Sequence, residues 1–198
     1  MLDARQTDRI IFRLVKGNSD LIKNIRSILL IQLGDIGDVV WATPTFRAVK
    51  EAYPQENVSV LLRESFGSLL EADPHIHKIF EVIQYKGNFL KRAGNKLAFI
   101  RDLRREIFYL VFDLRSDDRG AYMALLSGAQ IRAALLYRGL KWRNFLFTHL
   151  VDPPVPKERI YGAAEQSLQI VREFGIDTKD TIPKLRVSEK VKKRAEKL

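Results

Sequence analysis

The chain has 198 residues, the length of one α/β domain with short appendages, and its 46% hydrophobic share is that of a packed protein. It has no cysteine and no run of about 18 uncharged apolar residues, which excludes disulfides, thiolate metal sites and a membrane-spanning helix. A net charge of +10 favours an anionic partner, which is a nucleic acid, an acidic lipid surface or a phosphorylated glycan, although a soluble protein that is merely basic has the same charge.

The first predicted element is a basic amphipathic helix within residues 1–24. Arg5, Arg9, Arg13 and Lys16 share one helical face, with apolar side chains roughly opposite. Such a helix lies on an anionic membrane surface or packs its apolar side on the domain, and the sequence leaves both open.

A continuous apolar run at residues 27–33 predicts a strand buried on both faces of a parallel sheet. Residues 34–38 turn the chain, and residues 39–53 have helical spacing. Pro44 falls within the first two turns, so a kink or a delayed start of this helix is expected.

The alternation of strand and helix then repeats. Further strands are predicted at residues 58–62, 79–83, 109–114 and 131–137, and helices at residues 66–72, 86–106, 119–127 and 161–174. This order is typical of a parallel sheet with helices on both faces, built from residues 25–175. Residues 176–198 are polar and charged, and we expect them to be a linker toward a further domain.

Two predicted strand ends carry polar loops, at residues 34–38 and 113–118. Ligands of open parallel sheets bind outside these carboxyl ends, so both loops are candidate sites. The first loop is neither GxGxxG nor a P-loop, and its two carboxylates would repel a phosphate. Asp38 at the helix start is either a general base for a sugar hydroxyl or a simple helix cap.

Three segments carry a resemblance to a known family. ILLIQLGDIGDVVWATPTFRAVKEAYP (residues 28–54), VSVLLRESFGSLLEADPHIHKIFEV (58–82) and YLVFDLRSDDRGAYMALLSGA (109–129) occur in the order and spacing of the ADP-heptose:lipopolysaccharide heptosyltransferases. The chain thus resembles glycosyltransferase family nine over about residues 25–190.

The resemblance implies a Rossmann-like, acceptor-binding N-terminal half of a GT-B enzyme, with a C-terminal nucleotide-sugar domain that this sequence lacks. It implies an inverting, metal-independent transfer from an ADP-sugar to an anionic glycolipid of the lipopolysaccharide core, with no cofactor. The catalytic base would be Asp38. Substrate contacts are predicted at Gly34, Asp35, Gly37, Thr43, Asp113 and Arg115.

The same resemblance implies a cytoplasmic enzyme at the inner face of the bacterial inner membrane. With the nucleotide-sugar half absent, we expect the chain alone to be inactive. Two positions depart from the family: Gln32 replaces a frequent Lys or Arg, and Gly162 replaces a frequent His. Either change points to a different acceptor or to lost activity.

Other features give weaker predictions. His75 and His77 lack a carboxylate-rich third ligand, so no metal site is predicted. The basic residues of 86–105 form a solvated helix face or meet an acidic acceptor, and they are not interleaved with aromatics as in single-strand binders, so nucleic acid is not an expected partner. The alternative function is a stand-alone Rossmann-like module that binds an anionic glycolipid or nucleotide without catalysis.

Overall fold

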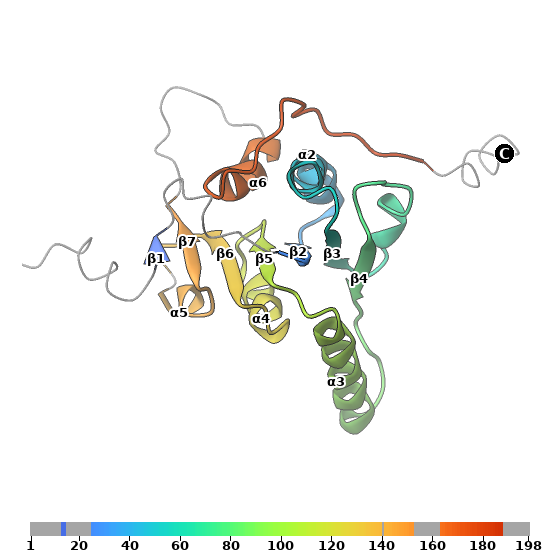
Figure 1. Ribbon diagram of the computed structural model, residues 1–198. Helices are drawn as coiled ribbons and strands as arrows, with labels where there is room; N and C mark the ends of the chain where they lie inside the picture. The colour runs from blue at the N-terminus through green and yellow to red at the C-terminus, as the bar shows by residue number, and fades with distance from the viewer. Residues whose placement is uncertain (1–12, 15–24, 140, 153–162, 188–198) are drawn as a thin grey trace, which may run out of the picture.

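The computed structural model describes residues 13–14, 25–139, 141–152 and 163–187. Its strands form one sheet in the order β1-β7-β6-β5-β2-β3-β4, and every neighbouring pair is parallel (Figure 1). The strands are β1 (Arg13–Leu14), β2 (Ser27–Gln32), β3 (Asn57–Arg63), β4 (Lys78–Val82), β5 (Leu110–Asp113), β6 (Ile131–Leu135) and β7 (His149–Val151).

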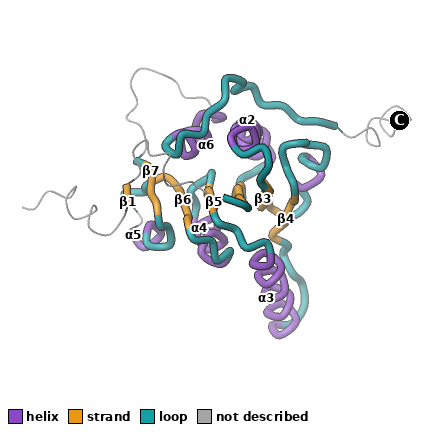
Figure 2. The backbone as a smooth tube through the Cα atoms, viewed as in Figure 1, coloured by secondary structure: helices purple, strands orange, loops and turns teal. Residues whose placement is uncertain are grey.

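Helices cover both faces of this sheet (Figures 1 and 2). One face carries α2 (Ile36–Ala52), the 3₁₀ turn η2 (Gly67–Leu69) and α6 (Ala163–Arg172); the other carries α3 (Phe89–Arg105), α4 (Asp118–Leu126) and α5 (Lys141–Asn144). None of the helices in the described part of the chain is long and apolar enough to cross a bilayer.

Strand β2 is the centre of the fold because all six of its residues are buried. Alternate side chains enter the two halves of the core: Leu30 packs with Phe46 of α2 and Leu168 of α6, whereas Leu29 packs with Leu103 of α3 and Ala121 of α4. A continuous apolar run is what a strand with helices on both sides requires. The predicted parallel sheet with helices on both faces is confirmed.

Helix α2 begins at Ile36 and continues through Pro44, so its start is not delayed to a residue after the proline. A proline has no N–H to donate to the carbonyl four residues earlier, which here belongs to Val40. The hydroxyl of Thr43 donates to that carbonyl at 2.8 Å and satisfies it locally.

Several predicted boundaries needed correction. Arg13 and Leu14 form a strand that pairs with β7 rather than part of a helix, and the rest of residues 1–24 lies outside the described residues. The helix predicted at 66–72 is a single 3₁₀ turn, and the helix predicted from residue 86 begins at Phe89. Strand β7 and helix α5 were not predicted, because three and four residues are too short to show a periodicity.

The polar segment after α6 runs back beside α2 (Figure 1). Arg47 donates from Nη2 to the carbonyl of Ile182 at 3.1 Å, and the backbone N–H of Lys184 donates to the Thr43 hydroxyl at 3.0 Å. Residues 176–187 are therefore fixed to the domain by contacts with α2.

Candidate active site

The strand order reverses between β2 and β5, since the chain runs from β2 outward to β4 and then crosses back to β5. Open parallel sheets bind ligands at the carboxyl ends of the strands beside such a reversal. The two loops that meet there follow Gln32 and Asp113, and they are the loops that the sequence singled out. The topology thus brings both candidate regions to one place.

Asp38 lies in the first turn of α2 with its carboxylate anchored on one side. Its Oδ2 accepts a hydrogen bond from the backbone N–H of Asp35 at 2.9 Å and forms an ion pair with the guanidinium of Arg115. The side chain is 41% exposed, and within the described residues its Oδ1 has no hydrogen-bond donor. One oxygen is held and the other is open to a ligand.

Gly34 is required by the crowding at this carboxylate. A Cβ at this position would overlap the Asp38 carboxylate and the Arg115 guanidinium. Its own N–H donates to the side-chain oxygen of the buried Gln32 at 3.2 Å. The backbone therefore passes under the ion pair at a distance that a side chain would prevent.

Arginines fasten the two loops together. Arg119 donates from Nη2 to the carbonyl of Leu33 at 3.1 Å and pairs with Asp117 at 3.2 Å. Asp117 caps α4 by accepting from the N–H of Gly120 at 2.8 Å and lies 3.5 Å from Nε of Arg115. These contacts orient Arg115 toward Asp38.

A cavity of about 260 Å³ opens beside Asp38. Asp38 and Arg115 line it together with the half-exposed Trp41, which lies one turn further along α2. Gln166 and Ser167 of α6 line it from the side, together with Gln32 and Leu114. The sequence interpretation missed Trp41, although a tryptophan three residues after the proposed base was a visible signal, and missed α6, whose approach depends on the tertiary fold.

A second cavity of about 480 Å³ lies on the other side of Arg119. Its cationic groups are Arg63, at the end of β3, and Arg119, while Tyr122 and Met123 of α4 provide an apolar wall. Asp35, at the start of α2, is exposed and forms an ion pair with Arg63. Each of the two arginines already pairs with a carboxylate, and Glu64 also lines the hollow, so an anionic ligand would bind through the remaining N–H groups of the arginines.

Asp113 is completely buried beneath the loop rather than exposed at the site. Burial raises the pKa of this carboxyl to about 7, and Arg143, whose Nη2 lies 3.6 Å away, offsets that shift only in part. Its Oδ1 accepts from the N–H of Ser116 at 3.1 Å, and a Cβ on Gly120 would overlap it. Asp113 therefore supports the loop that carries Arg115 and has no exposed surface for a substrate.

The remaining predicted positions are placed as follows. Thr43 is buried, and its hydroxyl donates to the Val40 carbonyl and accepts from the Lys184 N–H. This hydroxyl is therefore not exposed to a ligand. Gly37 lies in the first turn of α2, where a Cβ would meet nothing within 4 Å. Gly162 lies outside the described residues. The ring of His75 contacts Asp73, with Nδ1 and Oδ1 2.7 Å apart.

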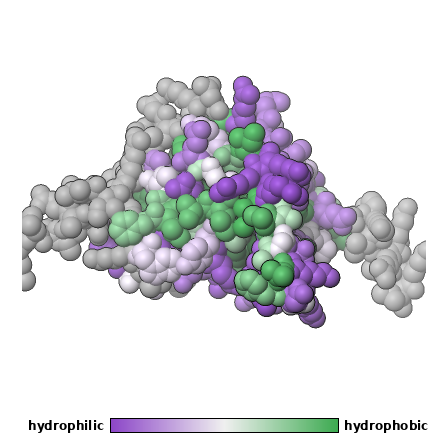
Figure 3. All heavy atoms as spheres, turned by 90° about the horizontal axis from the view of Figure 1, so that it is seen from below, coloured by the Kyte–Doolittle hydropathy of each residue, from purple (hydrophilic) through white to green (hydrophobic). Residues whose placement is uncertain are grey.

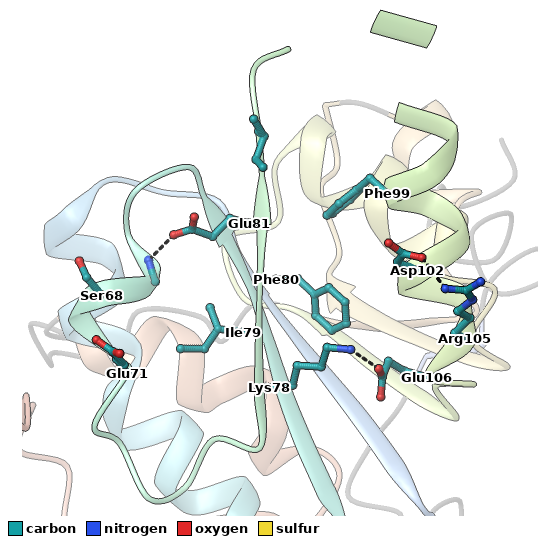
Figure 4. A pocket seen from close by; sticks show the side chains of 12 residues that line it. Ser68, Glu71, Lys78, Ile79, Phe80, Glu81, Phe99, Asp102, Arg105 and Glu106 are labelled. Carbon is teal, nitrogen blue, oxygen red and sulfur yellow. Dashed lines mark hydrogen bonds and ion pairs between the residues drawn. The ribbon is translucent and has the colours of Figure 1, made fainter. Parts of the chain in front are cut away.

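A larger hollow, of about 790 Å³, lies elsewhere, between β4 and α3 (Figure 4). Lys78 pairs there with Glu106 at 2.5 Å and Arg105 with Asp102 at 3.0 Å, and two further carboxylates, Glu71 and Glu81, also line it. It flanks the edge strand instead of the carboxyl ends, and its carboxylates outnumber its cations. The cavities at Asp38 and Arg119 are therefore the better candidates for an active site.

Comparison with known proteins agrees with the geometry. The chain matches no family model. It is 25% identical over 145 residues to lipopolysaccharide heptosyltransferase 3 of Escherichia coli, and 25% identical over 144 residues to the protein of that name from strain K12. These alignments cover 72% and 71% of this chain but 41% and 40% of the relatives, so the chain spans less than half their length.

Solved structures give the same result for the fold. A family 9 glycosyltransferase of Veillonella parvula superposes with a TM-score of 0.66 at 19% identity, covering 87% of this chain and 48% of that one. The chain resembles the heptosyltransferases of glycosyltransferase family nine. The E. coli ADP-heptose heptosyltransferase II has a TM-score of 0.60 at 20% identity over 85% of this chain and 49% of its own.

A third structure, E. coli heptosyltransferase WaaC with ADP, has a TM-score of 0.60 at 14% identity and covers 78% of this chain and 48% of that one. In each case the match takes up about half of the glycosyltransferase. The Rossmann-like fold of one half of a GT-B glycosyltransferase is thereby confirmed for this chain.

Proposed function

We propose that this chain is the acceptor-binding half of an inverting, metal-independent glycosyltransferase, in which Asp38 is the base. The observation that carries the proposal is the asymmetric carboxylate: Oδ2 is fixed by Asp35 and Arg115, Oδ1 has no donor among the described residues, and Asp38 lines the same cavity as Trp41. A general base needs a fixed position and a free oxygen, and this arrangement supplies both.

In the proposed reaction, an acceptor hydroxyl gives its proton to Oδ1 of Asp38. The hydroxyl oxygen attacks the anomeric carbon of an ADP-sugar as the bond from that carbon to the diphosphate oxygen breaks, and the electron pair leaves with ADP. Attack from the face opposite ADP inverts the anomeric centre. Arg115 holds the carboxylate in place through their ion pair.

The acceptor we propose is an anionic glycolipid of the lipopolysaccharide-core type. The sugar that carries the attacking hydroxyl would lie over the indole of Trp41, and acidic groups of the glycan would meet Arg63 and Arg119 in the neighbouring cavity. The donor contacts would belong to a second, nucleotide-sugar-binding domain, and the length of the relatives allows one, since their chains are more than twice as long as the matched region. The setting would be the cytoplasmic face of the inner membrane.

The test is Asp38→Ala in a protein that carries both halves. We expect sugar transfer to fall by about 10²- to 10⁴-fold, which is the usual contribution of a general base, while the affinity for the ADP-sugar stays within about twofold. Transfer at near-normal turnover would remove Asp38 as the base. Binding of an anionic core oligosaccharide without any transfer by the unmutated protein would favour a binding module.

A further inference from the structure

Helix α3 leaves the body of the domain and exposes large apolar side chains. Phe89, Leu90 and Leu97 are 80%, 78% and 68% exposed, and Leu103 near its other end is the helix's one buried residue. In Figure 1 the helix extends away from the sheet below β4. Exposed aromatic and aliphatic side chains grouped on one element indicate a contact surface rather than ordinary scatter.

These side chains share one helical face. Phe89, Leu90, Ala93 and Leu97 fall within roughly 100° around the axis at 3.6 residues per turn, and we call them the α3 stripe. Leu90 and Leu97 are about 120° or more from Leu103 and Phe99, which face the domain. Phe89 is about 40° from Leu103, and it is exposed because it begins the helix, at the end opposite Leu103. The stripe therefore points outward, and Figure 3 shows apolar surface on the side of the molecule that α3, α4 and α5 cover.

Basic side chains flank the stripe, and no acidic residue lies among them from residue 83 to residue 101. The cations of this stretch are Lys86, Lys91, Arg92, Lys96 and Arg101. In the described part of the chain no carboxylate pairs with any of the five, whereas Arg105 further along α3 is paired with Asp102. Unpaired cations beside an exposed apolar stripe complement an anionic, amphipathic surface.

The position of α3 relative to the candidate site gives a reason for this helix to contact a membrane. Six residues separate Val82, where β4 ends, from Phe89, where α3 begins, so the stripe starts on the side of the sheet where Asp38 lies. Val82 and Gln84 line the cavity of Arg63 and Arg119. A stripe resting on lipid at this edge would place that cavity next to the headgroups of the membrane.

We propose that α3 docks on an anionic bilayer, with the α3 stripe entering the headgroup boundary and its flanking cations meeting lipid phosphates. The benefit for catalysis rests on the proposed function, because it assumes an acceptor anchored in lipid. The docking itself is measured without sugar transfer, so a failure of one claim is distinguishable from a failure of the other.

The chain's lack of cysteine permits a direct measurement. Leu90→Cys carrying an environment-sensitive fluorophore is mixed with phosphatidylethanolamine vesicles that contain about one third phosphatidylglycerol, and with pure phosphatidylcholine vesicles as the neutral control. Ile182→Cys, exposed on the segment beside α2, is the matched position. We expect a blue shift at position 90 with the anionic vesicles alone and none at position 182.

Variants then test the two components by vesicle co-sedimentation. The triple variant Phe89→Ser, Leu90→Ser and Leu97→Ser should bind at least about tenfold more weakly. The triple variant Lys91→Gln, Arg92→Gln and Lys96→Gln should lose about fivefold in binding for each charge removed. The pairs Ile182→Ser with Val187→Ser, and Lys179→Gln with Arg186→Gln, alter exposed residues elsewhere and should bind like the parent.

Binding that survives both α3 variants would overturn the proposal and assign the contact to another basic segment, such as residues 1–24. A parent chain that fails to bind the anionic vesicles would overturn it as well. So would a parent chain that does not bind vesicles but self-associates, if the serine variant abolishes that self-association.

Discussion

Replacing Gly34 with alanine perturbs the proposed base without touching it chemically. The new Cβ would overlap the Asp38 carboxylate and the Arg115 guanidinium, so the ion pair has to separate. The backbone of Gly34 is outside the left-handed region, and alanine therefore adds no backbone strain of its own. The whole effect should come from the displaced side chains.

The magnitude follows from what is lost. An ion pair whose partners are 38% and 41% exposed contributes about 0–1 kcal/mol, and the hydrogen bond from Asp35 N–H to Asp38 contributes about 1 kcal/mol more. We expect the free energy of unfolding to fall by about 1–2 kcal/mol. Sugar transfer should fall much further, by about 100-fold, because a displacement near 1 Å costs that much in a positioned catalytic group.

The assay compares Gly34→Ala with Gly94→Ala, using urea unfolding of the chain and transfer by a protein that carries both halves. Gly94 lies inside α3, and a Cβ there would meet nothing within 4 Å. That change should stabilise by about 0.5–1 kcal/mol and leave transfer unchanged. If both variants transferred sugar at the same rate, the close approach of the Gly34 backbone to Asp38 would not be required for catalysis.

Two further predictions concern neighbouring residues. Burial raises the pKa of the Asp113 carboxyl from its ordinary value of 3.8 to about 7 in the folded chain, so its contribution to stability is present at low pH and is lost as pH rises through 7. Urea unfolding should give a free energy about 2 kcal/mol lower at about pH 8 than at pH 5.5, and Asp113→Asn should remove most of that slope; an unchanged slope would contradict it. Trp41→Ala should weaken binding of an acceptor oligosaccharide about five- to thirtyfold in calorimetry, since roughly 1–2 kcal/mol of contact is lost, and an unaltered affinity would exclude the stacking role.

The fold was predictable where the sequence pattern is strong. The apolar run of β2 and the helical spacing after it placed the centre of the sheet and its covering helix, because burial on both faces leaves a continuous signal. Strands β1 and β7, of two and three residues, have too little sequence to show alternation. Their pairing depends on the sheet that the longer strands have already formed.

The site was predictable in outline but not in its contacts. The sequence indicated Asp38 and Arg115 separately, and the reversal of strand order at β2 and β5 brings them into an ion pair. The burial of Asp113 depends on Arg143, which lies thirty positions away in α5, an element that the pattern did not predict. Interactions between distant segments are set by tertiary packing, which local periodicity does not record.

The most direct test of the central claim is a titration of the 198-residue chain itself, followed by amide NMR. Addition of a deacylated, acidic core oligosaccharide should shift the signals of residues 34–38 and 115–119, whereas ADP-heptose should leave them unchanged. The account predicts saturable binding of the oligosaccharide that Trp41→Ala weakens. Saturable binding of ADP-heptose at these residues, with no response to the oligosaccharide, would contradict the assignment of this chain as the acceptor half.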